Sequence, residues 1–233
     1  AFFTNEKSEI THLKKYLSSA DHKNLTVLLK NKSKNIKKGL LSFDLNPNQK
    51  IILISLKKNQ KSNETEKNGA KLTDFLKSEG AEVIHIVSDT ITLNLKPDAI
   101  YEFLHGMRLK AYSFDRYKSK KDSNTLKVNV IMLKKFDKKI YDKFKAIELG
   151  VNYTKDLVSE PGNILHPDEY AKRLTQLKKI GLKVSVYDEK QLKKMGCNAL
   201  VGVGQGSIRG SYLVTLEWRG KKSNSKPLAF VGK

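Results

Sequence analysis

The pattern of apolar and polar positions divides the first 136 residues into short apolar runs and stretches with helical spacing. The runs at residues 25–29 and 50–56 predict two buried strands. The second run is rich in β-branched residues, which is typical of a strand covered on both faces. Further strands are expected at residues 81–87 and 126–133.

Helices are expected between these strands. Apolar residues recur at helical spacing over residues 70–76, and Gly80 supplies a stop signal. Pro97 predicts the first turn of another helix, whereas the polar residues 58–68 predict a loop. The resulting β-α-β-α-β order predicts an α/β domain with a mixed sheet over residues 1–136.

A different pattern begins near residue 136. Helical spacing over residues 141–158 predicts a long linker helix within residues 137–160. Pro167 begins another helix that stops before Gly181. A further helix, at residues 190–195, is capped by Asp188, and strands are expected at residues 182–187, 211–218 and 227–231.

The fold class expected is therefore α/β in two domains. A small N-terminal α/β domain with a mixed sheet covers residues 1–136, and the linker helix covers residues 137–160. Residues 161–233 begin a second α/β domain. Because the last expected strand lies directly before Lys233, we expect this second domain to be incomplete, with too little chain to close its sheet.

Charge is the most unusual feature of the composition. The chain of 233 residues has 45 Lys+Arg against 24 Asp+Glu, a net charge of +21. Such a charge is typical of nucleic-acid binding, which gains free energy from counterion release. Only five of the basic residues are arginine, however, and arginine is preferred for phosphate and base recognition. A solvated lysine-rich surface is therefore favoured over a nucleic-acid site.

Other classes are excluded more simply. No apolar run approaches the roughly 18 residues of a membrane helix, so no membrane partner is expected. The single cysteine, Cys197, excludes an internal disulfide framework and a cysteine-rich zinc site. We expect a soluble protein in a reducing compartment.

Few side chains form a recognisable catalytic motif. The five histidines have no metal-ligand spacing, and no serine lies in a nucleophile elbow. The glycines of residues 202–207 suggest a dinucleotide loop, but a strand rather than a helix is expected to follow them. A tight turn lining a cleft between two strands is the better interpretation. Cys197 is expected to be an ordinary buried thiol, and the loop 159–167 a rigid structural connection.

Three segments together resemble the leucyl aminopeptidase (cytosol aminopeptidase) family, in its bacterial type. Residues 155–167, KDLVSEPGNILHP, resemble the family's R-D-L-x-N-x-P-x-N-x-x-x-P. Met195-Gly196 with residues 200–207 is similar to M-G-M-G-x-L-x-x-V-x-x-G-S, and the ending VGK resembles the family's V-G-K-G. Residues 111–118 are a weaker match to the end of the N-terminal domain.

The match is imperfect at four positions. Lys155 and Ser159 stand where the family has Arg and Asn, and Cys197-Asn198 stands where it has Met-Gly. All four are peripheral to the family's metal site. The resemblance therefore identifies residues 1–136 as the family's N-terminal domain and residues 161–233 as the start of its catalytic domain.

The resemblance implies an enzyme. In this family two divalent metal ions, such as Mn²⁺ or Zn²⁺, activate a water that releases N-terminal amino acids, leucine in particular, from peptides. It assigns Lys233 as a metal ligand. The other ligands and the catalytic groups lie beyond Lys233 in the family, so no catalytic residue is expected within this chain, which alone is predicted to be inactive.

The resemblance also implies a cytoplasmic homo-hexamer acting on peptide substrates. The alternative is a DNA-binding module that uses the basic N-terminal domain, a role that some bacterial members combine with peptidase activity.

Overall fold

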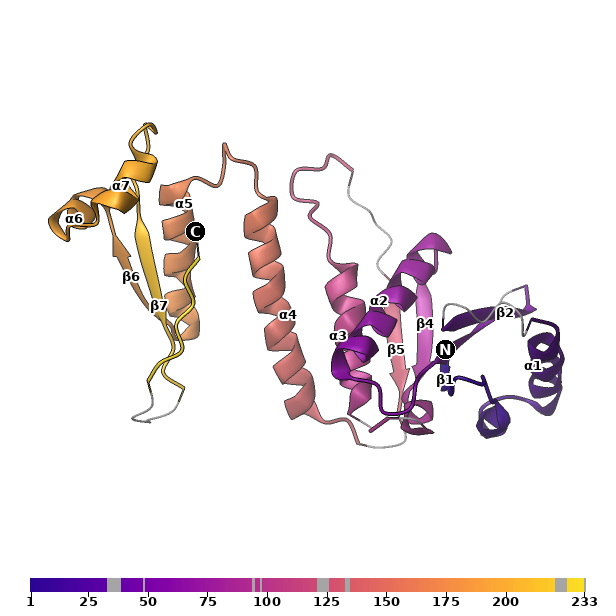
Figure 1. Cartoon of the computed structure of the whole chain (residues 1–233). Coiled ribbons are helices and arrows are strands. Elements are labelled where there is room, and N and C mark those ends of the chain that lie inside the picture. The colour runs from indigo at the N-terminus through magenta and orange to yellow at the C-terminus, as the bar shows by residue number, and fades with distance from the viewer. Residues whose placement is uncertain are drawn as a thin grey trace. The chain divides into compact units, whose positions relative to one another are not determined.

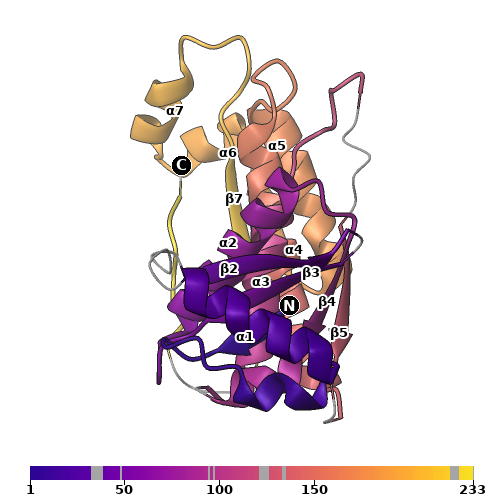
Figure 2. The ribbon, with the colours of Figure 1, turned by 90° about the vertical axis from the view of Figure 1, so that its right-hand side faces the viewer.

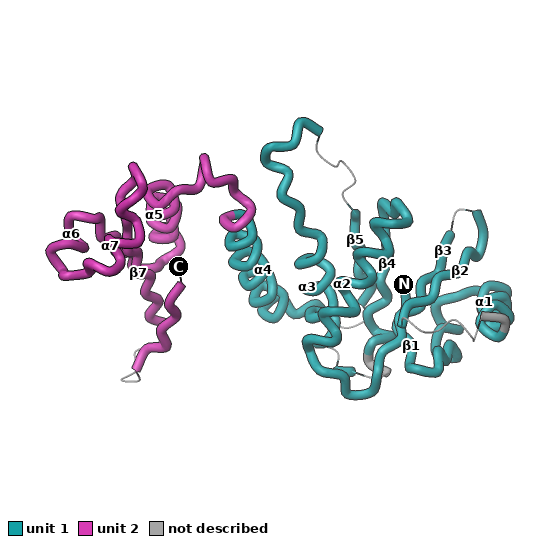
Figure 3. The backbone as a smooth tube through the Cα atoms, turned by 45° about the horizontal axis from the view of Figure 1, so that its top comes forward, with its two compact units in different colours: residues 1–156 teal, residues 157–233 magenta. Residues whose placement is uncertain are grey.

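A computed structural model describes residues 1–32, 39–47, 49–93, 95–96, 98–120, 126–132, 135–220 and 226–232. The chain forms two compact units, residues 1–156 and residues 157–233, which are coloured separately in Figure 3. Each unit is described by itself. No helix in the described ranges is both long and apolar enough to cross a membrane.

Unit 1 is built on a mixed five-stranded sheet with the order β2-β3-β1-β4-β5 (Figure 1). Strands β1, β3, β4 and β5 are parallel, and β2 is antiparallel to β3. The strands are β1 (Phe2–Thr4), β2 (Leu40–Asn46), β3 (Gln49–Ser55), β4 (Val83–Val87) and β5 (Lys127–Ile131). The predicted mixed α/β architecture is thereby confirmed.

Helices cover both faces of this sheet. The helical segments of unit 1 are η1 (Thr11–Lys15), α1 (Ser19–Lys32), α2 (Ser62–Ser78), η3 (Ser88–Leu93), α3 (Ala99–Ala111) and α4 (Lys138–Ser159), the last of which continues into unit 2. Figure 2 shows α1 on the near side of the sheet, with α2 and α3 on the opposite side. Alternate residues of β3 therefore enter different cores: Ile52 and Ile54 pack with α2 and α3, whereas Ile51 and Leu53 pack with α1. This two-sided burial explains the continuous apolar run that predicted the strand.

Two predictions for unit 1 are wrong. Residues 25–29 were expected to form a strand but lie inside α1. Leu25, Leu28 and Leu29 have the i, i+3, i+4 spacing of one helical face and pack on the α1 side of the core, while Val27 is 52% exposed. The short apolar run is thus the buried face of an otherwise polar helix.

The second error concerns residues 58–68, which were expected to form a loop, although α2 begins at Ser62. Thr65 and Gly69 lie on the buried face of its first half. Because these buried residues are polar or small, the apolar spacing that would predict a helix is missing from this part of the sequence. Strand β2, whose sequence is LLSFDLN, and the three-residue strand β1 were not predicted at all. Pro97, expected to open α3, lies outside the described residues.

Unit 2 contains a two-stranded antiparallel sheet and short helices. Its elements after α4 are α5 (Pro167–Thr175), η4 (Gln176–Ile180), β6 (Lys183–Tyr187), α6 (Glu189–Lys194), α7 (Asn198–Gly204) and β7 (Leu213–Glu217). The helix start at Pro167, the stop before Gly181 and the Asp188 cap are confirmed. The Asp188 carboxylate accepts a hydrogen bond from the backbone N–H of Gln191 at 2.8 Å.

Two predictions for unit 2 are wrong, the first of them only in part. The turn expected at residues 202–207 is limited to its second half, because residues 202–204 form the last turn of α7 and the turn follows at residues 205–206. The strand expected at residues 227–231 is irregular, and Phe230 and Val231 are 89% and 100% exposed. A strand needs a hydrogen-bonded neighbour, and this segment pairs with neither β6 nor β7 in the described part of unit 2.

The closest packing in unit 1 is between α2 and α3, where glycines bring two backbones together. A Cβ on Gly69 would lie 2.0 Å from the Phe103 carbonyl oxygen, and one on Gly106 would lie 2.0 Å from the Glu66 carbonyl oxygen. The Thr73 hydroxyl, buried at the same contact, is 3.2 Å from the Met107 carbonyl oxygen and donates to it. Only glycine allows this approach at positions 69 and 106.

We expect Gly69→Ala to lower the free energy of unfolding by about 3 kcal/mol, because the methyl group meets backbone that cannot move aside. Gly150→Ala is the matched control: Gly150 lies inside α4 with nothing within 4 Å of its position for a Cβ. This control should stabilise the protein by about 0.5–1 kcal/mol. Urea unfolding of both variants measures the difference, and equal stabilities would contradict the packing described.

Candidate functional site

The end of α4 is attached to the end of α3 within unit 1. The Tyr112 hydroxyl donates a hydrogen bond to the Asp156 carboxylate at 2.8 Å, and Arg116 lies 3.7 Å from the same carboxylate. Lys155 Nζ donates to the Leu109 carbonyl oxygen at 2.9 Å and lies 5.0 Å from the centre of the Tyr112 ring. The first two residues of segment 155–167 therefore contact segment 111–118, and both segments carry the family resemblance.

The loop after α4 is held by a buried ion pair. The Glu160 side chain is fully buried, and its Oε1 lies 2.7 Å from Arg173 Nη1 on α5. Arg173 Nε also donates to Glu169 Oε1 at 3.0 Å. The hydrogen bond to Glu160, followed by that to Glu169, raises the pKa of Arg173, and the bond from Arg173 lowers the pKa of Glu169. One guanidinium thus fixes the loop to the first turn of α5.

A second polar cluster lies at the start of α5. His166 Nδ1 pairs with the Asp168 carboxylate, which also accepts a hydrogen bond from Arg209 Nη1 at 3.0 Å. Arg209 follows the glycine-rich residues 202–207 and Asp168 follows residues 155–167, so this ion pair joins the ends of two of the segments that resemble family motifs. These three side chains are partly exposed and pair with one another, which favours a positioning role over acid–base chemistry.

The described residues do not form a metal centre. No three His, Cys, Asp or Glu side chains converge in the ranges that the structure describes. Lys233, the metal ligand that the resemblance assigns, lies outside the described residues. Cys197 is a half-buried free thiol at the start of α7, less buried than expected. No step through a metal ion can therefore be derived from these residues.

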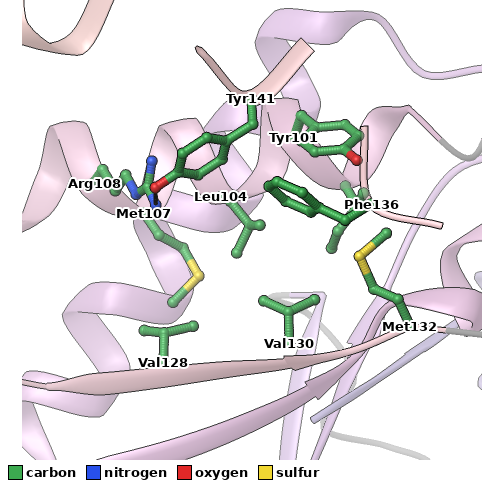
Figure 4. A pocket seen from close by; sticks show the side chains of 10 residues that line it. Tyr101, Leu104, Met107, Arg108, Val128, Val130, Met132, Phe136 and Tyr141 are labelled. Carbon is green, nitrogen blue, oxygen red and sulfur yellow. Dashed lines mark hydrogen bonds between the residues drawn. The ribbon is translucent and has the colours of Figure 1, made fainter. Parts of the chain in front are cut away.

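A small apolar pocket of about 120 Å³ lies in unit 1 between α3, β5 and the start of α4 (Figure 4). Its one charged group, Arg108, is already engaged. Arg108 Nη2 donates to the Tyr141 hydroxyl at 2.7 Å, and its guanidinium lies 4.6 Å from the centre of the Tyr141 ring and 3.5 Å from Glu148. These contacts hold α4 against α3, and the pocket offers no nucleophile.

Two family models match the chain, in the order that the resemblance implies. The model of the cytosol aminopeptidase family, N-terminal domain, matches residues 1–121, and that of the catalytic domain matches residues 152–233. The chain belongs to the cytosol aminopeptidase family. This membership confirms the resemblance on which the functional expectations depend.

Curated relatives agree with the family models. A probable cytosol aminopeptidase of Rhizobium johnstonii is 36% identical over 204 residues, which cover 80% of this chain and 39% of the relative. One of Phytoplasma australiense is 38% identical over 156 residues, which cover 66% of this chain and 32% of the relative. One of Brucella melitensis is 40% identical over 175 residues, which cover 69% of this chain and 36% of the relative. The matched part thus spans between 32% and 39% of the length of these relatives.

Solved structures share the fold. A tomato leucine aminopeptidase variant superposes with a TM-score of 0.70 and 19% identity, covering 92% of this chain and 44% of the tomato chain. The bottromycin maturation enzyme BotP, in a complex with Mn, superposes with a TM-score of 0.63 and 17% identity, covering 81% of this chain and 41% of BotP. At these identities the likeness shows the fold alone.

The loop 159–167 could be recognised in the sequence as a rigid connection, but the arginine that holds it could not. Glu169 and Arg173 are spaced i, i+4 on α5, which is a visible signal for an ion pair. Glu160 directly precedes Pro161 and lies nine residues before Glu169. This distance along the chain does not indicate that the Glu160 side chain is buried against Arg173.

We expect Arg173→Met to lower the free energy of unfolding by about 3 kcal/mol, because it leaves the buried Glu160 carboxylate without this cation. The control is Arg219→Met. Arg219 pairs with Glu217 at an exposed position, so its loss should lower the free energy of unfolding by less than about 1 kcal/mol. Chemical unfolding followed by the fluorescence of Trp218, which lies in unit 2, measures both. Equal effects of the two substitutions would contradict the role given to Arg173.

The Arg173→Met substitution should also change how the stability of the protein depends on pH. Arg173 lowers the pKa of Glu169 below its ordinary value of 4.5, so the folded state binds fewer protons than the unfolded state below that pH. The stability from Glu169 is present above pH 4.5 and is lost as the pH falls through the lowered pKa. Arg173→Met should flatten that fall.

Proposed function

We propose that this chain provides the N-terminal domain and the first part of the catalytic domain of a metal-dependent aminopeptidase that releases N-terminal residues, leucine in particular, from peptides. The observation that carries this proposal is the match of the catalytic-domain model to residues 152–233. That range contains the loop held by Glu160 and Arg173 and ends at Lys233.

In this proposal the chain's own residues position the catalytic domain. Tyr112 and Lys155 hold the end of α4, and Glu160 with Arg173 sets the direction in which the chain enters α5. Residues 1–136 act as the N-terminal domain, residues 137–160 as the linker helix and residues 161–233 as the start of the catalytic domain.

Two divalent metal ions, Mn²⁺ or Zn²⁺, supply Lewis-acid chemistry in the proposed enzyme. Lys233 is proposed as one ligand, with the remaining ligands outside these 233 residues. The homo-hexamer and the cytoplasmic location are parts of the same proposal. The DNA-binding alternative gains no support from the described residues or from the relatives.

A chimera tests this proposal. Residues 1–233 are joined to the remaining part of the catalytic domain of the Phytoplasma australiense relative, and hydrolysis of L-leucine p-nitroanilide is measured with Mn²⁺. We expect turnover by the chimera that EDTA abolishes, and none by the 233-residue chain alone. Lys233→Ala should lower kcat by about 100-fold or more, because the loss of a ligand costs at least as much as the loss of a group that supports one.

Lys226→Ala is the control, because Lys226 is an exposed lysine of the same segment and is expected to leave kcat unchanged. The proposal fails if the folded, metal-loaded chimera hydrolyses nothing. It also fails if the 233-residue chain alone shows metal-dependent turnover, since its active site would then be complete.

A further inference from the structure

Unit 1 has a larger, polar groove that the aminopeptidase proposal does not use. It lies between α2 and the edge strand β2, beside the end of β3, and has a volume of about 720 Å³. Volumes between about 300 and 1,000 Å³ are typical of sites for small organic ligands. The lining residues that matter here are Leu40, Lys57, Gln60, Lys67, Lys71 and Phe75.

The position of the groove in the sheet favours ligand binding. The parallel neighbours β1 and β3 both end at this edge, where the Leu56 N–H donates to the Thr4 carbonyl oxygen at 2.9 Å. After β1 the chain continues to α1 on one face of the sheet, whereas after β3 it continues to α2 on the other face. In open α/β sheets, ligands bind outside the carboxyl ends of the strands. The groove lies at the carboxyl end of β3, on the β2 side of that strand and next to the point where the connections diverge.

The charges that line the groove are predominantly positive. Lys57, Lys67 and Lys71 form no ion pair within the described residues, and Lys67 and Lys71 lie one helical turn apart, about 6 Å along α2. Of the two acidic lining residues, Asp74 pairs with Lys110 at 3.0 Å. Glu64 accepts a hydrogen bond from the Lys61 N–H at 3.0 Å and keeps its negative charge. The three ammonium groups therefore outnumber Glu64, the one lining carboxylate without an ion pair within the described residues.

The floor of the groove suits an organic group next to that anion. Leu40 and Phe75 are partly buried and pack against the main core of unit 1. Gln60 is held in place, because its Oε1 accepts from the Lys57 N–H at 3.2 Å and its Nε2 donates to Thr65 Oγ1 at 2.9 Å. The site thus combines apolar surface, a fixed amide and an excess of positive charge.

We propose that this groove binds a small phosphorylated organic molecule, with its phosphate oxygens on Lys57, Lys67 and Lys71 and its organic part against Leu40 and Phe75. Lysine ammonium groups form charge-assisted hydrogen bonds to phosphate oxygens. The concave shape and the small volume favour a metabolite over the extended backbone of a nucleic acid.

Calorimetric titration of the 233-residue chain with ADP tests the proposal, with inorganic pyrophosphate and adenosine as the two partial ligands. We expect ADP to bind, pyrophosphate to compete with it, and adenosine to bind more weakly than either. Lys67→Gln with Lys71→Gln should raise the Kd for ADP at least about tenfold, because two charge-assisted contacts are lost.

The matched control is Lys143→Gln with Lys145→Gln, which removes the same charge from exposed positions of α4 and should leave the Kd within about twofold. An equal rise of Kd in both double variants would overturn the proposal, because binding would then follow net charge alone. The proposal is also overturned if neither ADP nor pyrophosphate binds. Displacement of ADP by a short DNA duplex, with equal loss of duplex binding in both variants, would assign the lysines to a nucleic-acid surface instead.

Discussion

The close contact between α2 and α3 is the constraint on which the rest of unit 1 depends. Gly69 and Gly106 allow the two backbones to approach, and Thr73 bonds across the contact. With both helices in place, one face of the sheet is covered, and the end of α3 presents Arg108 and Tyr112 to α4. The attachment of α4 to unit 1 therefore depends on two glycines at the contact between α2 and α3.

Much of this fold could be predicted from apolar spacing, and the errors have physical causes. Strand β3 was predicted because both of its faces are buried, and α4 because its apolar positions repeat over many turns. The first half of α2 was missed because its buried face consists of Thr65 and Gly69, which are not apolar markers: Thr65 bonds to Gln60, and Gly69 allows α3 to approach closely. Strand β1 has three residues, too few to show alternation, although it lies at the centre of the sheet.

The candidate site was predictable only in part. The motif segments identified the family. In the structure, segment 155–167 is held at two points: Asp156 bonds to Tyr112, and Glu160 pairs with Arg173. The partners of these carboxylates, Tyr112 and Arg173, are distant in sequence or lie on another element, so spacing could not reveal them. The metal centre is a different case: its assigned ligand, Lys233, lies outside the described residues, and the other ligands are proposed to come from other sequence.

The central claim is that these 233 residues belong to an aminopeptidase polypeptide. The most direct test purifies the activity against L-leucine p-nitroanilide from the source of this sequence and measures the intact mass of the polypeptide that carries it. We expect the activity to co-purify with a polypeptide that contains this sequence and has a mass well above 26.4 kDa. Activity that separates from every polypeptide containing this sequence would contradict it.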